Sequence, residues 1–311
     1  MTRDTALGPG REFDVVRELI ARWGERASGI GDDAAVLDVP TGERLVVSTD
    51  SSVEHAHFRR EWLTAREIGY RATAAALSDL AAMAAAPLGV VVALSCPESW
   101  LAELGHIAEG IGDVVAHAGT HVVGGDLTAA NELVLAITVL GSSPAPLERR
   151  GARPGDQVYV TGALGGPLAA LDALLAGHEP SPAARARFVH PTPRIREARW
   201  LAARGAHAMI DISDGLLGDA AHIAAASGVR LVLDLDALPT VDGARIAEAV
   251  RSGEEYELIA VSPVRLDATA FEHDFGIPLT HIGRVEAGAP GVEAYANGER
   301  VASGAGFNHF S

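Results

Sequence analysis

The chain has 311 residues, of which 48% are hydrophobic, and its formal net charge is −16 at pH 7. The length fits two domains of ordinary size, and the acidic balance argues against nucleic acid and anionic membranes as partners. All 25 of the Lys and Arg residues are arginine, which excludes the lysine of a P-loop, of a protein kinase strand and of a Schiff base.

Cysteine content and apolar runs bear on the compartment. Cys96 is the only cysteine, so an intramolecular disulfide and a thiolate metal site are excluded. Charged residues such as Arg3 and Arg11 stand near the N-terminus without an apolar run, so we expect no secretory signal. The longest apolar stretch, Leu80 to Leu94, is broken by Pro87 and is too short to span a bilayer. We expect a cytoplasmic protein.

Alternating helix and strand patterns indicate an α/β or α+β architecture. A capping box, Thr64-x-x-Glu67, predicts the start of a helix that runs to about Met83. The other elements expected in the first half are a helix over 13–23, a strand over Leu45–Thr49 ending at Asp50, a strand over Leu88–Ser95, a helix over Trp100–Ala118, and strands over His121–Val123 and Leu133–Leu140.

A turn-rich break at 141–156 separates the halves, and we place the boundary near residue 148. This predicts an N-terminal domain over 1–148 and a C-terminal domain over 149–311. Thr192-Pro193 predicts a helix start with Thr192 as N-cap, and Gly205 closes that helix. The other elements expected in the second half are strands over Gln157–Thr161, Ala208–Ile212, 230–235, 257–261 and 280–284, a glycine-rich turn over 162–166, and a helix over Gly215–Ala226 closed by Gly228.

Acidic residues gather at the ends of these elements, in loops rich in Gly, Ser and Thr. Five stretches share the pattern: Gly31-Asp32-Asp33, Ser48-Thr49-Asp50, Leu77-Ser78-Asp79, Gly124-Gly125-Asp126 and Asp211-Ile212-Ser213-Asp214-Gly215. Mg²⁺ prefers oxygen ligands and usually keeps waters and phosphate oxygens. Carboxylates that converge from such loops could hold these ions, which would neutralise phosphates during phosphoryl transfer. The pattern reconciles an acidic, lysine-free chain with an anionic substrate.

Each motif taken singly has a structural alternative. An Asp after a strand or before a helix is usually a cap, and Asp214 fits that role. Asp79 differs, because a lone carboxylate within the Ala-rich helix over 72–86 is costly unless it is paired or metal-bound. Gly124-Gly125 also marks any tight turn. The turn over 162–166 fits an ordinary strand–helix connection as well as a phosphate loop.

Two further pairs could contact a ligand. His55 and His57 share a face if their segment is extended, and one His contacting a phosphate or aromatic ligand is favoured over a zinc pair. A surface His pair is the equal alternative. Arg149 and Arg150 could clamp a phosphate or be solvated linker charges.

Taken in order, the motifs resemble the thiamine-monophosphate kinase family. Those that carry the resemblance are Gly29–Leu37, Ser48-Thr49-Asp50, His57-Phe58, Leu77–Met83, Gly124-Gly125-Asp126, Gly151–Asp156 with Val160–Gly162, Pro191–Ile195, Asp211–Leu216, Glu254–Leu258 and Gly306–Phe310. The match runs from about residue 12 to the C-terminus. It implies that ATP and Mg²⁺ are used to phosphorylate thiamine monophosphate to thiamine diphosphate by direct in-line transfer, without a covalent enzyme intermediate.

The resemblance also implies a fold and a set of site residues. The fold is the two-domain α/β (α+β) architecture of aminoimidazole ribonucleotide synthetase. Its N-terminal domain binds ATP and metal through a mixed sheet that pairs in a homodimer, and a C-terminal α/β domain completes the substrate site. The implied magnesium ligands are Asp33, Ser48, Thr49, Asp50, Asp79, Asp126, Asp211 and Asp214, of which Asp33, Asp50 and Asp214 are the catalytic ones. ATP would contact Gly125, Asp126, Arg149 and Ser213, and thiamine monophosphate would contact His57 and Glu254.

The chain departs from the family pattern in the implied thiamine pocket. Ser252-Gly253-Glu254-Glu255 stands where the family has Gly-Gly-Glu-Asp, and Gly304 stands where it has an aromatic residue. Two alternatives to the kinase are therefore an ATP-dependent enzyme of the same superfamily with another acceptor, and a non-catalytic MgATP-binding protein.

Overall fold

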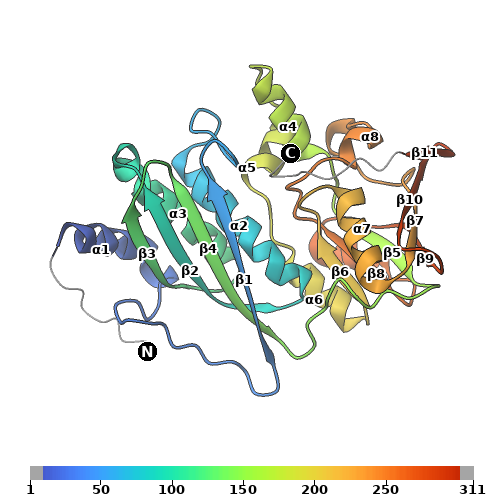
Figure 1. The fold of residues 1–311 in the computed structure, drawn as a ribbon, viewed down its shortest axis with the longest axis horizontal. Coiled ribbons are helices and arrows are strands. Elements are labelled where there is room, and N and C mark those ends of the chain that lie inside the picture. The colour runs from blue at the N-terminus through green and yellow to red at the C-terminus, as the bar shows by residue number, and fades with distance from the viewer. Residues whose placement is uncertain (1–9, 302–311) are drawn as a thin grey trace. The chain divides into compact units, whose positions relative to one another are not determined.

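The computed structural model describes residues 10–301, which form two compact α/β units (Figure 1). The first unit ends at Ala145, and the second begins at Pro146 and also includes Ala81–Ala84. The mixed α/β class expected from the sequence is confirmed. Within the described range, no helix is long and apolar enough to cross a membrane. The cytoplasmic location and the domain limits near 148 stay predictions.

The first unit is a four-stranded sheet in the order β1-β4-β2-β3 with helices along one face (Figure 1). Strands β1 and β2 both pair antiparallel with β4, whereas β3 pairs parallel with β2, so the expected mixed sheet is confirmed. The elements are α1 (Arg11–Trp23), a 3-10 helix (Gly24–Arg26), β1 (Arg44–Val53), α2 (Ala65–Ala82), β2 (Ala86–Cys96), a 3-10 helix (Glu98–Glu103), α3 (Leu104–His117), β3 (Val122–Ala129) and β4 (Val134–Ser143).

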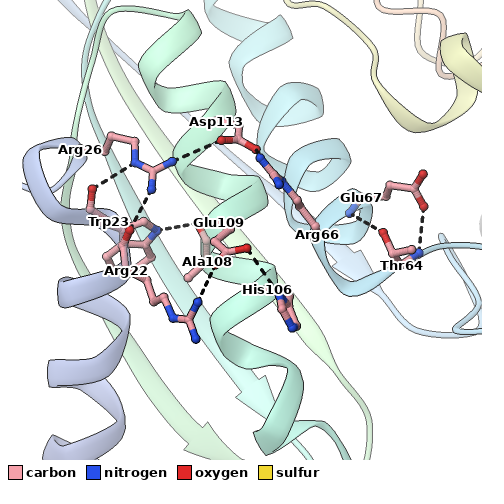
Figure 2. Close-up of polar contacts among 10 residues, drawn as sticks. All are labelled: Arg22, Trp23, Arg26, Thr64, Arg66, Glu67, His106, Ala108, Glu109 and Asp113. Carbon is pink, nitrogen blue, oxygen red and sulfur yellow. Dashed lines mark hydrogen bonds and ion pairs between the residues drawn. The ribbon is translucent and has the colours of Figure 1, made fainter.

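Helix α2 begins at the capping box that the sequence predicts. The amide of Thr64 donates to Glu67 Oε2 at 2.9 Å, and the amide of Glu67 donates to Thr64 Oγ1 at 3.3 Å (Figure 2). Two glycines then bring α2 and α3 together. A Cβ at Gly69 would lie 2.1 Å from the carbonyl oxygen of Ile107, and one at Gly110 would lie 1.9 Å from that of Arg66. Only glycine permits this backbone contact, which packs α2 and α3 tightly behind the sheet.

Asp113 of α3 joins three segments of the first unit (Figure 2). Its Oδ1 accepts from Arg26 Nη1 at 3.2 Å, and its Oδ2 accepts from Arg66 Nε of α2 at 2.8 Å. Just after Arg26, the amide of Ser28 donates to the carbonyl of Val122 on β3 at 2.9 Å. The irregular segment that carries Asp33 therefore starts from a fixed place beside β3.

The other face of this sheet is covered by no described element of its own unit. Side chains alternate between the faces of a strand, and on β4 the alternation is regular, with Leu135, Ile137 and Val139 buried on the helix side. On β1 the opposite set includes Leu45 and Val47, whose exposed fractions are 52% and 54%. Leu45 and Val47 therefore make this face of the sheet a candidate interaction surface.

The second unit is a seven-stranded mixed sheet in the order β11-β10-β7-β9-β5-β8-β6. Helix α7 packs against β6, β7, β8 and β10, and the resulting core includes Ile210, Leu216, Ile223 and Ile259. The elements are β5 (Gln157–Thr161), α4 (Gly166–Leu175), α5 (Pro182–Val189), α6 (Ile195–Ala203), β6 (Ala208–Asp211), α7 (Leu216–Ser227), β7 (Arg230–Asp234), a 3-10 helix (Val241–Gly243), α8 (Ile246–Ala249), β8 (Leu258–Ser262), α9 (Ala268–Phe275), β9 (Leu279–Glu286), β10 (Gly291–Ala296) and β11 (Glu299–Val301).

Several sequence predictions differ from the structure. The helix expected to start after Thr192 begins at Ile195, and its N-cap is Arg194, whose side chain is drawn inward to a buried carboxylate. Strand β3 does not stop at Val123 but continues through Gly124 to Ala129, because it stays paired with β2. The sequence pattern did not predict α4, α5, α8, α9, β10 and β11, which are short or lack a clear period.

Candidate active site

Two of the predicted metal ligands meet in the first unit. Ser48 of β1 donates from Oγ to Asp79 Oδ2 of α2 at 2.5 Å, and Asp79 is half-buried. The sequence predicted that a carboxylate within this apolar helix would need a partner, and the hydrogen bond from Ser48 supplies one for Asp79. Asp50 lies two residues beyond Ser48 on β1 and so faces the same side of the sheet. Ser48, Asp50 and Asp79 are oxygen donors of the kind that Mg²⁺ prefers.

Thr49 and Asp126 lie on the opposite, open face of the same sheet. Thr49 Oγ1 is 3.0 Å from Thr138 Oγ1 of β4, and Asp126 pairs in register with Ala93 of β2. These two residues are also on different edges, because β1 and β3 are the outer strands. Three strand spacings of about 4.8 Å put them roughly 14 Å apart. A single chain does not bring Asp50 and Asp126 to one ion.

Asp33 lies exposed in the irregular segment before β1, where its amide donates to Asp32 Oδ1 at 2.9 Å. In the range 10–301, no group of three or more His, Cys, Asp and Glu side chains is placed to hold a metal ion. The convergence of all the predicted carboxylates on magnesium stays a prediction.

The ring of His57 is oriented by its own segment. Its Nδ1 lies 3.1 Å from the amide nitrogen of Val53 at the end of β1, and its carbonyl accepts from Arg71 Nη1 at 2.8 Å. An amide N–H can only donate, so Nδ1 must accept and the proton of the neutral ring is on Nε2. His57 therefore presents a donor nitrogen, as a residue that contacts a phosphate would.

Gly125 has a packing reason to be glycine. A Cβ there would lie 2.1 Å from the carbonyl oxygen of Val92 on the neighbouring strand, whereas a Cβ at Gly124 would meet nothing within 4 Å. Gly124 and Gly125 do not form a tight turn, which was the alternative interpretation of the sequence, because both residues are within β3.

The second unit holds the remaining acidic motif at the end of β6. Asp211 is the last residue of β6 and is buried, and the loop Ser213-Asp214-Gly215 leads into α7. Asp214 is not the side-chain cap that the sequence suggested, since Gly215 occupies the N-cap position. Instead, Asp219 in the first turn of α7 accepts from the amides of Ser213, Asp214 and Gly215 at 3.0, 3.0 and 3.1 Å.

Asp219 interacts electrostatically with two predicted magnesium ligands, Asp211 and Asp214, whose side chains carry charge of the same sign. Burial raises its pKa to about 7, and the negative charges of Asp211 and Asp214 add to the increase against the lowering effect of the donated amides. A divalent cation at Asp211 and Asp214 would offset this repulsion.

Glu254 lies against the same loop. Its amide donates to the carbonyl oxygen of Ser213 at 2.7 Å, and the amide of Tyr256 donates to that of Ile212 at 2.9 Å. Glu254 and Tyr256 have φ angles of 55° and 53°, in the left-handed region that non-glycine residues rarely adopt. Each such residue costs about 1–3 kcal/mol and persists only where its surroundings hold it. The structure thus places a predicted substrate residue next to a predicted ATP residue in a strained segment.

Buried ion pairs lie at the end of that strained segment. Glu257, which is fully buried, accepts from Arg194 Nη2 at 2.6 Å and from Thr161 Oγ1 at 2.6 Å. It also forms an ion pair with Arg187, whose Nη2 lies 2.8 Å from Glu257 Oε1. Burial alone would raise the pKa of Glu257, but Arg194 and Arg187 hold it at about 2. The neighbouring Glu255 is also buried, and there desolvation prevails and raises its pKa to about 7. Two guanidinium groups therefore fix the ionised Glu257 at the start of β8.

Arg149 lies at the other end of α7 from Ser213. Its carbonyl accepts from Ser227 Oγ at 3.2 Å, and Ser227 is the last residue of α7, whereas Ser213 precedes the first. Twelve helical residues span about 18 Å. Arg149 is exposed, and it is not among the residues that line the nearby hollow, which include Arg150, Arg153 and His207.

Comparison with known proteins identifies the family of the chain. The family model "AIR synthase related protein, N-terminal domain" matches residues 31–143, and "AIR synthase related protein, C-terminal domain" matches residues 153–294. Thiamine-monophosphate kinase of Salmonella typhimurium is 35% identical over 94% of this chain and 97% of its own length. The chain belongs to the thiamine-monophosphate kinase family.

Solved structures of the thiamine-monophosphate kinase family match along nearly the whole chain. The kinase of Stenotrophomonas maltophilia K279a superposes with a TM-score of 0.82 at 34% identity, covering 94% of this chain and 98% of that one. AaThiL complexed with AMPPCP and TMP superposes with a TM-score of 0.77 at 28% identity, covering 96% and 97%.

The structure of this member of the thiamine-monophosphate kinase family adds residues that sequence reasoning missed. Asp219 and the Arg187–Glu257–Arg194 group support the loops that bear Ser213 and Glu254. Asp219 carries a weak sequence signal, an acid in the first turn of a predicted helix. Glu257 lies within the Glu254–Leu258 motif, but an acid in a strand pattern gives no hint of its partners, arginines 63 and 70 residues upstream.

Proposed function

We propose that this chain is an ATP-dependent kinase that transfers the terminal phosphoryl group of ATP to thiamine monophosphate, forming thiamine diphosphate. The observation that carries the proposal is the hydrogen bond from the amide of Glu254 to the carbonyl of Ser213. It ties a segment that would contact the acceptor to a loop that would contact ATP. In-line transfer depends mainly on such positioning, because the protein itself has little covalent chemistry to do.

Two residues that depart from the family pattern, Ser252 and Glu255, have side chains that point into the interior of the second unit. Ser252 is fully buried, and its Oγ accepts from the amide of Leu168 at 3.2 Å. Glu255 is 1% exposed, and its Oε1 accepts from the amide of Gly165 at 2.5 Å. Both side chains therefore form hydrogen bonds within the second unit. Of the motif's acidic residues, this leaves Glu254 to contact the phosphate acceptor. The third departure, Gly304, and the Gly306–Phe310 motif lie outside the described residues.

The donor atoms available fit magnesium. Mg²⁺ is usually held by one or two carboxylates together with phosphate oxygens and waters. Asp79 beside Ser48 supplies such a set in the first unit, and Asp211 with Asp214 supplies one in the second. Bound there with ATP, the ions would neutralise the charge that develops on the transferring phosphoryl group. The residues of this lysine-free chain would then bind and orient the substrates, while the ions offset the phosphate charge. Nε2 of His57 would donate a hydrogen bond to the phosphate of the acceptor.

The product assay tests this function. The chain is incubated with ATP, Mg²⁺ and thiamine monophosphate, and thiamine diphosphate is separated by chromatography. Formation of thiamine diphosphate with one ADP per product is the expected result. ATP consumed only with another acceptor would favour a different enzyme of the superfamily, and MgATP binding measured by calorimetry without turnover would favour a non-catalytic protein.

We further propose that the kinase is a homodimer joined through the open face and edges of the four-stranded sheet. Leu45 and Val47 are exposed on that face, and the outer edges of β1 and β3 pair with no other strand in the described chain beyond an isolated bridge at Val122. Unpaired edges and apolar faces favour association with a second copy. Pairing of β1 with β3 of a partner would leave only one strand spacing, about 4.8 Å, between the strand that carries Asp50 of one chain and the strand that carries Asp126 of the other. The two side chains start from opposite faces of the joined sheet, so an active site that uses both would have to be built around that pair of strands.

Mixing two inactive variants tests this arrangement. We expect Asp50→Asn and Asp126→Asn each to lose activity as separate dimers. After unfolding and refolding together, half of the dimers would be mixed, and each mixed dimer would have one intact site, which restores about a quarter of the wild-type rate. No recovery from a mixture shown to contain mixed dimers would mean that both aspartates act within one chain.

A further inference from the structure

A single carboxylate oxygen organises the loop that leads into α7. Oδ2 of Asp219 accepts from three consecutive amides, those of Ser213, Asp214 and Gly215, at 3.0 to 3.1 Å. The Asp219 residue is 2% exposed, so these hydrogen bonds are protected from competing water. Three amides that converge on one buried acceptor fix the backbone of the loop far better than one cap would.

These amides form the kind of concavity that often binds a phosphate. Successive N–H groups at the start of a helix attract anions through their partial positive charge. Here the protein's own carboxylate fills the concavity, so the amides already have their acceptor. The loop is left to present its hydroxyl and carboxylate side chains to a ligand, and such groups would interact with ATP through metal ions.

The loop is also held from its other side. The amide of Ser213 bonds to Asp219, while the carbonyl of Ser213 accepts from the amide of Glu254. Gly215 adopts φ +112°, and a Cβ there would lie 3.1 Å from the carbonyl oxygen of Val250. The chain of contacts therefore runs from Asp219 through Ser213 to Glu254, with little room for the loop to shift.

We propose that Asp219 is a positioning residue for phosphoryl transfer. By holding three amides, it sets Ser213 and Asp214 in place and aligns them with Glu254 through the Ser213 carbonyl. Asp219 itself touches neither substrate. This role rests on the kinase function proposed above. Loss of the Asp219 carboxylate should lower kcat/KM for ATP by more than the accompanying loss of stability would explain.

Three variants separate this role from a merely structural one. Asp219→Ala removes the acceptor of all three amides, whereas Asp219→Asn keeps one carbonyl oxygen of the same reach. Ile223→Ala is the matched control, because Ile223 is fully buried one turn further along α7 and leaves the loop hydrogen bonds intact. Each variant is assayed for melting temperature, kcat, and KM for ATP and for thiamine monophosphate.

The expected results differ for each variant. Misplacement of a reacting group by about 1 Å can cost 100-fold, so Asp219→Ala should lower kcat/KM for ATP by about 100-fold. Asp219→Asn should recover about tenfold of that loss and stay about tenfold below wild type, since it still offers an acceptor but lacks the negative charge that strengthens the hydrogen bonds. Ile223→Ala should lower the melting temperature as much as Asp219→Ala while keeping kcat/KM within about threefold of wild type.

Two outcomes would overturn the role of Asp219. One is an Asp219→Ala enzyme with kcat/KM within threefold of wild type, and the other is an equal loss in Ile223→Ala. If Asp219→Ala does not fold, Asp219→Asn decides, because wild-type kinetics in that variant would also overturn it. MgATP binding by calorimetry is measured on every variant. If the wild-type chain makes no thiamine diphosphate, the kinase function fails. The role of Asp219 is then tested by MgATP binding alone, and an unchanged dissociation constant in Asp219→Ala would reject it.

Discussion

Ser48 of β1 and Asp79 of α2, 31 residues apart in sequence, lie 2.5 Å from each other through Oγ and Oδ2. The contact joins two of the five acidic motifs, and Asp50 faces the same side of the sheet as Ser48. It also accounts for a carboxylate in an Ala-rich helix, since an unpaired one would destabilise the fold. In the second unit, Asp211, Asp214 and Asp219 form a comparable group.

Asp50→Asn and Asp214→Asn should each lower kcat by at least about 100-fold, because loss of a carboxylate removes charge that would hold Mg²⁺ against the phosphates. Neither change should lower the melting temperature, since both side chains reach solvent. Thiamine diphosphate formation is measured at several Mg²⁺ concentrations. The exposed carboxylates Glu61 and Asp172 provide matched controls as Glu61→Gln and Asp172→Asn, which should retain full activity. Full activity in Asp50→Asn or Asp214→Asn would reject its metal role.

Gly125→Ala should destabilise the first unit by about 3 kcal/mol, because the added methyl group would collide with the carbonyl oxygen of Val92. For a unit of this size, that corresponds to a fall in melting temperature of about 6–12 °C, measured without ligands by calorimetry. Gly124→Ala is the control and should change the stability by no more than about 0.5 kcal/mol, because its Cβ meets nothing. Equal melting temperatures for the two variants would contradict the packing described for β3.

Val47→Asp should convert the proposed homodimer to a monomer. A carboxylate placed within an apolar interface would be buried without a partner, which should raise the dissociation constant at least about 100-fold. Sedimentation at several protein concentrations measures the change. Leu175→Asp alters a similarly exposed apolar residue, 60% exposed on α4 of the second unit, and should leave the dimer intact. A Val47→Asp chain that sediments like wild type would show that the open face is not the interface.

Glu255→Gln should change how stability depends on pH. Burial raises the pKa of Glu255 to about 7, whereas the unfolded chain titrates near 4.5. Between these values the folded chain keeps a proton that the unfolded chain has released, so the stabilisation is present below pH 4.5 and is lost as the pH rises to 7. Relative to wild type, the variant should therefore gain about 2 kcal/mol between pH 5 and pH 8. Urea unfolding at pH 5, 6, 7 and 8 measures the difference, and parallel curves for the two proteins would contradict a raised pKa.

Several elements could be predicted from local pattern because their causes are local. The capping box at Thr64 and Glu67, the helix closed by Gly228 and the strand over Gln157–Thr161 all occur as expected. Each depends on residues within a few positions of one another. The start of α6 was wrong for the opposite reason, because Arg194 pairs with Glu257, 63 residues away.

The amino-acid sequence by itself determined the acidic, lysine-free chemistry, the ordered motifs and therefore the family. Only the tertiary structure decided which of those motifs meet: Ser48 with Asp79, and Ser213 with Glu254 and Asp219, while Asp126 lies on the far edge from Asp50. The physical reason is that residue types and short spacings set the local conformation and the available chemistry. Contacts between distant segments depend instead on strand register and on how helices pack, and neither can be read from spacing along the chain.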